Sequence, residues 1–249
     1  MPLNESNERI WEIDFFRGVA IILMIMFHII FNLKHFSIIH YNVWNGPVMI
    51  SGRLTASIFI IIVGISLTIS YNKKKNIFSQ SKIYVDMVKR GVKIFSLGLL
   101  ITAITWIIIP ERFVIFGILH CIGICIILSL PFISYIRLNV ILGTLIVLSG
   151  IALRAHTFDV SYLLPFGFIP QAFVTIDYFP LLPWFGVVLY GIALGNYVYP
   201  NGQRRFHVTD TFTFRFPQKI CFIGRHSLPI YLVHQPLILG FIFLFFLMD

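Results

Sequence analysis

Long apolar runs dominate this chain and restrict its fold more than any other feature. In residues 19–27, within the first of these runs, no side chain is polar. Of the 249 residues, 58% are hydrophobic and only 12% are charged, and the mean hydropathy is +0.89. Runs of about 20 apolar residues are long enough to cross a bilayer as helices. We therefore predict an all-α integral membrane protein that forms a single domain over residues 1–249.

Seven apolar segments are predicted to span the membrane. They are residues 10–33, 53–71, a segment ending near 109, 113–130, 138–153, 179–199 and 226–247. An amphipathic helix is expected at 77–93, lying at the interface and bending into the third span. If the N-terminus is cytosolic, the inner segments hold fifteen of the nineteen lysines and arginines. The positive-inside rule therefore predicts a cytosolic N-terminus and a C-terminus outside.

The formal net charge of +9 comes from these short segments between apolar runs. We interpret it as a topology signal and as contact with anionic lipid, and we expect no nucleic-acid partner. The three cysteines have no metal-ligand spacing, so no metal site is predicted. The predicted location is the cell membrane, as a multi-pass protein.

One face of the first predicted span carries polar residues. Arg17 and His28 are eleven residues apart, which places them about 20° apart around a helix and about 16 Å apart along it. Asp14 lies within about 40° of the same stripe. Ionisable groups inside a membrane are costly and are therefore functional candidates. His28 has the chemistry of a general base or a transient nucleophile, although a histidine bonded between helices is an equal alternative.

Further polar residues occur in or beside other predicted spans. They are His120 in the fourth span, His234 and Gln235 in the seventh, and Asp177 at the outer mouth of the sixth. Each histidine taken alone is more often a packing residue than a ligand. Tyr178 and Trp184 flank the same mouth, where an aromatic belt at the membrane interface is the alternative interpretation.

Five ordered motifs carry a resemblance to a known family. They are Ile13-Asp14-Phe15-Phe16-Arg17-Gly18-Val19-Ala20, Trp44-Asn45-Gly46, Phe116-Gly117-Ile118-Leu119-His120, Asp177-Tyr178-Phe179-Pro180-Leu181-Leu182-Pro183-Trp184 and Gly224-Arg225-His226-Ser227-Leu228-Pro229-Ile230-Tyr231-Leu232-Val233-His234-Gln235-Pro236. Together they resemble the catalytic-domain family of heparan-alpha-glucosaminide N-acetyltransferase, especially its small prokaryotic members, within the transmembrane acyltransferase superfamily. The resemblance covers nearly the whole chain.

The resemblance implies transfer of an acetyl group from cytosolic acetyl-CoA to an amine or hydroxyl of a saccharide or glycolipid acceptor at the outer face. It also implies that basic residues on the cytosolic side meet the phosphates of CoA: Arg17, Lys89, Arg90 and Arg225. Asn45, His120, Asp177, Tyr178, Trp184, His234 and Gln235 are the other expected binding residues. A homodimer is a further expectation, because related enzymes are often dimeric.

The resemblance leaves two candidates for the catalytic base. Related O-acyltransferases have an arginine, ten residues and then a histidine, which is the spacing of Arg17 and His28. In the lysosomal member of the family an asparagine occupies the position of His28. There the catalytic histidine precedes a Trp-Asn-Gly by three residues, whereas His40 precedes Trp44 by four.

Two other function classes remain open from the sequence. A proton-coupled small-molecule transporter could use Asp14, Arg17, His28, His120 and His234 as a relay. No inverted repeat supports a transporter. A haem-binding cytochrome is the third class, since histidines on several spans can ligate iron.

Overall fold

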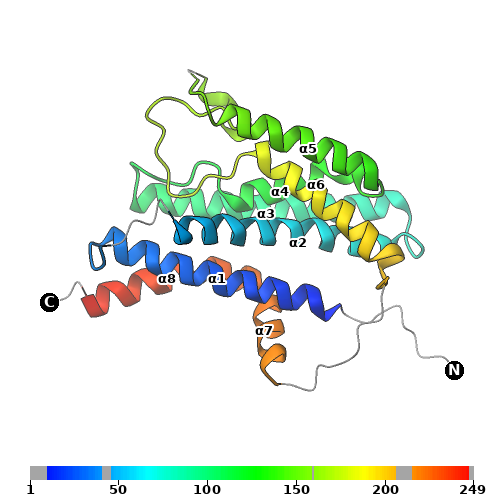
Figure 1. Ribbon diagram of the computed structural model, residues 1–249, viewed down its shortest axis with the longest axis horizontal. Helices are drawn as coiled ribbons and strands as arrows, with labels where there is room; N and C mark the ends of the chain where they lie inside the picture. The colour runs from blue at the N-terminus through cyan, green and yellow to red at the C-terminus, as the bar shows by residue number, and fades with distance from the viewer. Residues whose placement is uncertain (1–9, 41–45, 159, 206–214, 247–249) are drawn as a thin grey trace. The chain divides into compact units, whose positions relative to one another are not determined.

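The computed structural model describes residues 10–40, 46–158, 160–205 and 215–246, and its regular structure there is helical apart from one isolated bridge (Figure 1). The α-helices are α1 Trp11–His35, α2 Pro47–Lys74, α3 Gln80–Ile108, α4 Ile118–Leu128, α5 Ile136–Leu153, α6 Leu181–Val198, α7 Arg215–Arg225 and α8 Ser227–Phe246. Short 3-10 helices occupy Leu130–Phe132, Ser161–Phe166 and Pro200–Gly202. Helices suit these sequences because every backbone polar group is satisfied within the segment, as a bilayer requires.

Six of the described helices are long and apolar enough to cross a membrane: α1, α2, α3, α5, α6 and α8. The all-α membrane class predicted from the sequence is confirmed. The segment predicted as the fourth span differs, because α4 has only 11 helical residues. At 1.5 Å per residue, α4 alone covers about 16 Å, roughly half of a hydrocarbon core.

Two other predicted boundaries differ from the structure. The amphipathic segment expected at 77–93 is not a separate helix but the beginning of α3, whose first turn is capped by the Ser79 side chain. The segment 200–225 was expected to be a basic loop, yet its last eleven residues form α7. Polar and basic residues on one side of α7 lower its average hydropathy, so a search for apolar runs missed it.

The chain divides into two compact parts. The terminal part comprises residues 1–62 and 208–249, and the central part comprises residues 63–207. The terminal part therefore contains α1, α7, α8 and the first turns of α2. The central part contains the remainder of α2 and α3 to α6.

In the terminal part, α1 packs against α7 and α8 (Figure 1). The contact with α7 is very close, because a Cβ on Gly224 would overlap the backbone oxygen of Asp14, and a Cβ on Gly18 would overlap that of Ile220. Along the other contact, α1 and α8 run side by side in the same direction. His28 lies level with Gln235. Further along α1, Leu33 lies beside residues of α8 that follow Gln235 in the sequence.

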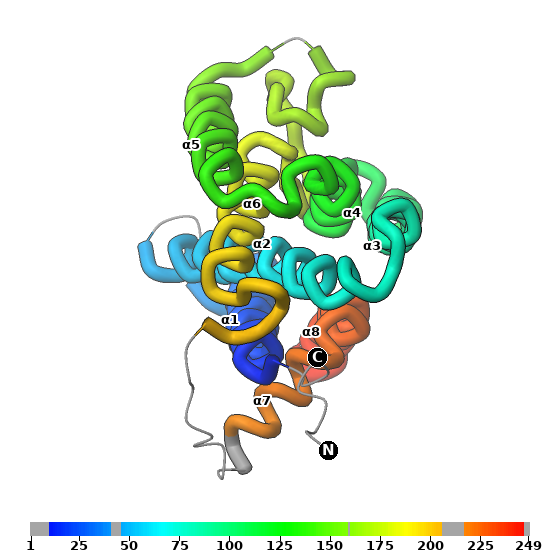
Figure 2. The backbone as a smooth tube through the Cα atoms, turned by 90° about the vertical axis from the view of Figure 1, so that its right-hand side faces the viewer, coloured from blue at the N-terminus to red at the C-terminus, as the bar shows by residue number. Residues whose placement is uncertain are grey.

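In the central part, α4 lies beside α3 (Figure 2), and the segment that contains α4 runs in the opposite direction to α3. Its successive contacts are Val114 with Thr105, His120 with Thr102, and Leu130 with Tyr84. The path from Thr105 to Tyr84 covers 21 residues of α3, or about 31 Å. The extended residues before α4 thus supply the length that the helix lacks.

The helix α6 is the core of the central part. It packs closely against α5, where a Cβ on Gly186 would lie 2.6 Å from the oxygen of Gly143. It also runs in the same direction as the second half of α2. Hydrogen bonds in register join these two helices, from Thr68 to Ile192 (3.3 Å) and from Asn72 to Asn196 (3.4 Å), and just beyond their ends Lys75 bonds to Asn201 (3.1 Å).

Candidate functional site

The polar face predicted on the first span is present on α1. Asp14 is buried, at 4% exposure, and its Oδ1 lies 3.2 Å from Nη1 of Arg17 one turn later. The backbone of Asp14 is the surface against which Gly224 of α7 packs. The first turns of α1 thus combine an ion pair with a tightly packed helix crossing.

His28 lies further along α1, where it meets two residues of α8. Nε2 of Gln235 donates a hydrogen bond to Nδ1 of His28 at 2.8 Å. The ring centroids of His28 and His234 are 4.9 Å apart. Nδ2 of Asn32, one turn after His28, donates to Oε1 of Gln235 at 2.9 Å. We name these four residues, Asn32, His28, Gln235 and His234, the histidine cluster.

His234 is the most enclosed histidine of the cluster, at 7% exposure. Its Nδ1 bonds to the backbone oxygen of Tyr231. Its Nε2 is buried and has no hydrogen-bond partner within the described residues. A buried polar nitrogen without a partner is unusual and indicates a place where another molecule binds or reacts.

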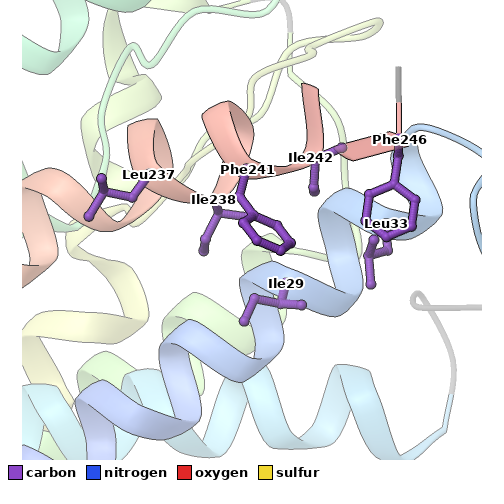
Figure 3. A pocket seen from close by; sticks show the side chains of 7 residues that line it. All are labelled: Ile29, Leu33, Leu237, Ile238, Phe241, Ile242 and Phe246. Carbon is purple, nitrogen blue, oxygen red and sulfur yellow. The ribbon is translucent and has the colours of Figure 1, made fainter. Parts of the chain in front are cut away.

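An apolar groove follows the histidine cluster between α1 and α8 (Figure 3). Its volume is about 320 Å³, and the side chains of Ile29, Leu33, Leu237, Ile238, Phe241, Ile242 and Phe246 line it. These residues extend toward the C-terminal ends of both helices. The polar cluster therefore borders a purely apolar surface on one side.

The central part holds a second group of predicted site residues, around the N-terminus of α4. Oδ2 of Asp177 accepts a hydrogen bond from the backbone N–H of Ile118 at 3.1 Å. Burial raises the pKa of Asp177 to about 6, although the N–H of Ile118 acts in the opposite direction. Gly117 makes room for the carboxylate, because a Cβ there would overlap Oδ2. Asp177 therefore caps α4 from another segment of the chain.

His120 lies beside this cap, and both of its ring nitrogens have partners. Nδ1 accepts a hydrogen bond from the backbone N–H of Gly117 at 3.2 Å. Nε2 is 3.4 Å from the hydroxyl oxygen of Thr102 on α3. With both nitrogens engaged, the geometry of His120 is that of a residue joining α4 to α3.

The two aromatic residues predicted near this mouth are positioned differently. The hydroxyl of Tyr178 donates to the oxygen of Leu164 at 2.7 Å, and burial raises the pKa of Tyr178 to about 12. Trp184 is buried against Phe179, with ring centroids 5.0 Å apart. Nε1 of Trp184 has no hydrogen-bond partner among the residues that the structure describes.

The remaining predicted site residues are exposed or lie outside the described residues. Lys89 and Arg90 are exposed on α3, and Arg225 is exposed at the end of α7. His40 is exposed in the segment after α1. Asn45 and the preceding Trp44 lie outside the described residues.

Two residues of these sites, Asn32 in the histidine cluster and Thr102 beside His120, were not predicted from the sequence. Asn32 follows His28 by four residues, so helical periodicity already places it on the same face. Thr102 has no comparable signal, because its partner His120 is on another helix. In the described part of the chain, no group of three or more histidine, cysteine, aspartate or glutamate side chains is arranged to hold a metal ion.

Comparison with known proteins gives one family. Residues 9–236 match the family described as Heparan-alpha-glucosaminide N-acetyltransferase, catalytic. No match was found among curated proteins or among solved structures. The matched range includes both groups of site residues and ends halfway along α8.

Proposed function

Since the chain belongs to the catalytic family of heparan-alpha-glucosaminide N-acetyltransferase and is therefore a transmembrane acetyltransferase, we propose that its donor is cytosolic acetyl-CoA. We propose that its acceptor is an amine or hydroxyl of a sugar-like molecule at the outer face. The acceptor supplies a nucleophilic nitrogen or oxygen on a polar ring.

The histidine cluster is the observation that carries this proposal. Two imidazoles and two carboxamides from α1 and α8 meet between long apolar stretches of these two helices. Placing polar groups there costs free energy, so their presence indicates a functional role rather than a contribution to stability. An imidazole in this cluster removes the proton of the acceptor while its nitrogen or oxygen attacks the thioester. A transient acetyl-imidazole is the other route for the same residues.

The proposal requires a chain that reaches both membrane faces, and we propose seven crossings with a cytosolic N-terminus. Two observations support an odd number. Because α1 and α8 run in the same direction, an odd number of crossings must lie between them, and the same holds for α2 and α6. Both conditions hold when the segment 113–130 is counted as a crossing, and its run of about 31 Å along α3 matches a hydrocarbon core.

Basic residues on the proposed cytosolic side support a donor with phosphate groups. Arg225 is exposed at the end of α7, and α7 packs against the first turns of α1, which carry Arg17. Guanidinium groups bind phosphate through paired, charge-assisted hydrogen bonds. Lys89 and Arg90 present further positive charge on α3 of the central part.

The test is an acetyl-transfer assay on the full chain in lipid nanodiscs, with acetyl-CoA and glucosamine as the probe acceptor. Released CoA thiol and acetylated glucosamine are measured together. We expect His28→Ala to lower turnover by about 100-fold or more, the usual effect of losing a catalytic acid or base or a hydrogen-bond donor to the developing oxyanion. His40→Ala is expected to retain turnover, and His156→Ala, an exposed histidine, is the matched control.

The alternatives give different results in this assay. Loss of turnover in His40→Ala with full activity in His28→Ala would show that His40, and not His28, is the catalytic histidine. Uptake of glucosamine into vesicles without consumption of acetyl-CoA would instead indicate a transporter. Absence of transfer by the wild-type protein from acetyl-CoA would refute the proposed donor and acceptor classes.

A further inference from the structure

We propose that the two histidines of the cluster have different roles, with Nε2 of His234 accepting the proton and Nε2 of His28 donating a hydrogen bond. This inference rests on the proposed acetyl transfer and names the groups that perform it. It makes His234 a catalytic residue, and it makes Gln235 and Asn32 positioning residues that act through His28.

The tautomer of His234 follows from its bond to the backbone. A carbonyl oxygen only accepts hydrogen bonds, so Nδ1 of His234 must carry the proton that bonds to the oxygen of Tyr231. In the neutral ring, Nε2 then has a free lone pair. This is the tautomer that a general base needs at Nε2.

The surroundings of that nitrogen distinguish it from an ordinary structural histidine. Nε2 of His234 is buried and has no partner within the described residues. His226, at the start of the same segment, has the same type of bond, from Nδ1 to the oxygen of Phe222 at 2.9 Å. His226 is exposed, so water can satisfy its Nε2. Of these two histidines, His234 is the one that combines the free lone pair with enclosure, which leaves its Nε2 available for a bound acceptor.

The tautomer of His28 is opposite and is set by two carboxamides. An amide nitrogen only donates, so Nδ1 of His28 accepts from Nε2 of Gln235. In the neutral ring the proton is then on Nε2. Gln235 keeps this orientation because its Oε1 accepts from Nδ2 of Asn32. Reversing the Gln235 amide alone would set its NH₂ against that of Asn32 and break this bond.

The cluster therefore offers one bare nitrogen and one N–H from rings 4.9 Å apart. In the reaction, the acceptor N–H or O–H gives its proton to Nε2 of His234, and the acceptor atom bonds to the carbonyl carbon of the thioester. The N–H of His28 stabilises the negative charge that develops on the carbonyl oxygen. The carbon–sulfur bond then breaks, and the CoA thiolate takes the proton back from His234. The products are the acetylated acceptor and CoA thiol.

The first test reads the tautomers directly by NMR of the full chain labelled with ¹⁵N-histidine in micelles near pH 7.5. Spectra of His28→Gln and His234→Gln assign the two rings. We expect His234 protonated at Nδ1 and His28 protonated at Nε2. Asn32→Leu is expected to shift the His28 signals toward a mixture of tautomers while those of His234 stay unchanged. A His234 ring protonated at Nε2 would overturn the proposal.

The second test separates kcat from KM in the acetyl-transfer assay with glucosamine. We expect His234→Gln to lower kcat by about 100-fold or more and to change the KM for acetyl-CoA by less than about threefold. His226→Gln is the matched control and is expected to retain wild-type constants. Gln235→Leu is expected to lower kcat by about tenfold, and Gln235→Glu, whose ionised carboxylate accepts from N–H groups but does not donate, is not expected to restore it.

The role of His234 and the proposed acetyl transfer can be refuted separately. If the wild-type protein transfers acetyl groups and His234→Gln keeps kcat within about threefold, the role given to His234 is wrong and the proposed function stands. If the wild-type protein transfers nothing to glucosamine, the proposed function is refuted as stated. The NMR spectra then still decide whether the two tautomers are arranged as inferred.

Discussion

The crossing of α1 and α7 is expected to fail when Gly224 is replaced by alanine. A Cβ on Gly224 would overlap the backbone oxygen of Asp14 and lie 2.9 Å from the nitrogen of Gly18. Both obstacles are backbone atoms, so α7 must move away from α1. Overpacking of this kind costs about 1–3 kcal/mol. A value of about 2 kcal/mol makes local opening of α7 about 30-fold more frequent.

Cys221 reports this opening because it is buried in α7, at 4% exposure. Burial raises the pKa of its thiol, and the nearby charge of Asp14 adds to this, although Arg225 acts in the opposite direction. Alkylation by iodoacetamide should therefore be slow in the wild-type protein and about 30-fold faster in Gly224→Ala. Peptide mass spectrometry follows the thiol separately from Cys121 and Cys125.

The matched control is Gly240→Ala in α8, where a Cβ meets no described atom within 4 Å. This variant should be alkylated at Cys221 at the wild-type rate. An unchanged rate in Gly224→Ala would show that α7 does not pack against α1 as described. Equal acceleration in both variants would show that the rate reports general loosening rather than the α1–α7 crossing.

Three further predictions concern other contacts. The raised pKa of Asp177 favours its protonated form in the folded state, so the contribution of this group to stability is fully present below about pH 4 and is lost as the pH rises through about 6. The melting temperature of Asp177→Asn should lack this component of the pH dependence. Gln235→Leu leaves the amide of Asn32 without its buried acceptor and should cost about 1–3 kcal/mol, measured by chemical unfolding in micelles against the exposed-site control Leu237→Ala. Gly123→Leu should lower the melting temperature by separating α4 from α3, because a Cβ there lies 2.8 Å from the oxygen of Gly91, and an unchanged value would contradict that packing.

The membrane class and the positions of most helices followed from the sequence, because a segment that crosses lipid must be apolar over its own length. This signal is local, so it needs no knowledge of neighbouring helices. It predicted α5, α6 and α8 to within a few residues. It missed α7, which is short and rich in polar residues and packs against α1.

The partners of each polar residue were decided only by tertiary structure. The spacing of Asp14, Arg17 and His28 on one face could be calculated from helical periodicity, and the same calculation includes Asn32. That His28 bonds to Gln235, 207 residues later, could not be calculated, because it depends on the register in which α1 packs against α8. Periodicity gives the face of a helix on which a side chain lies, whereas packing determines what that face meets.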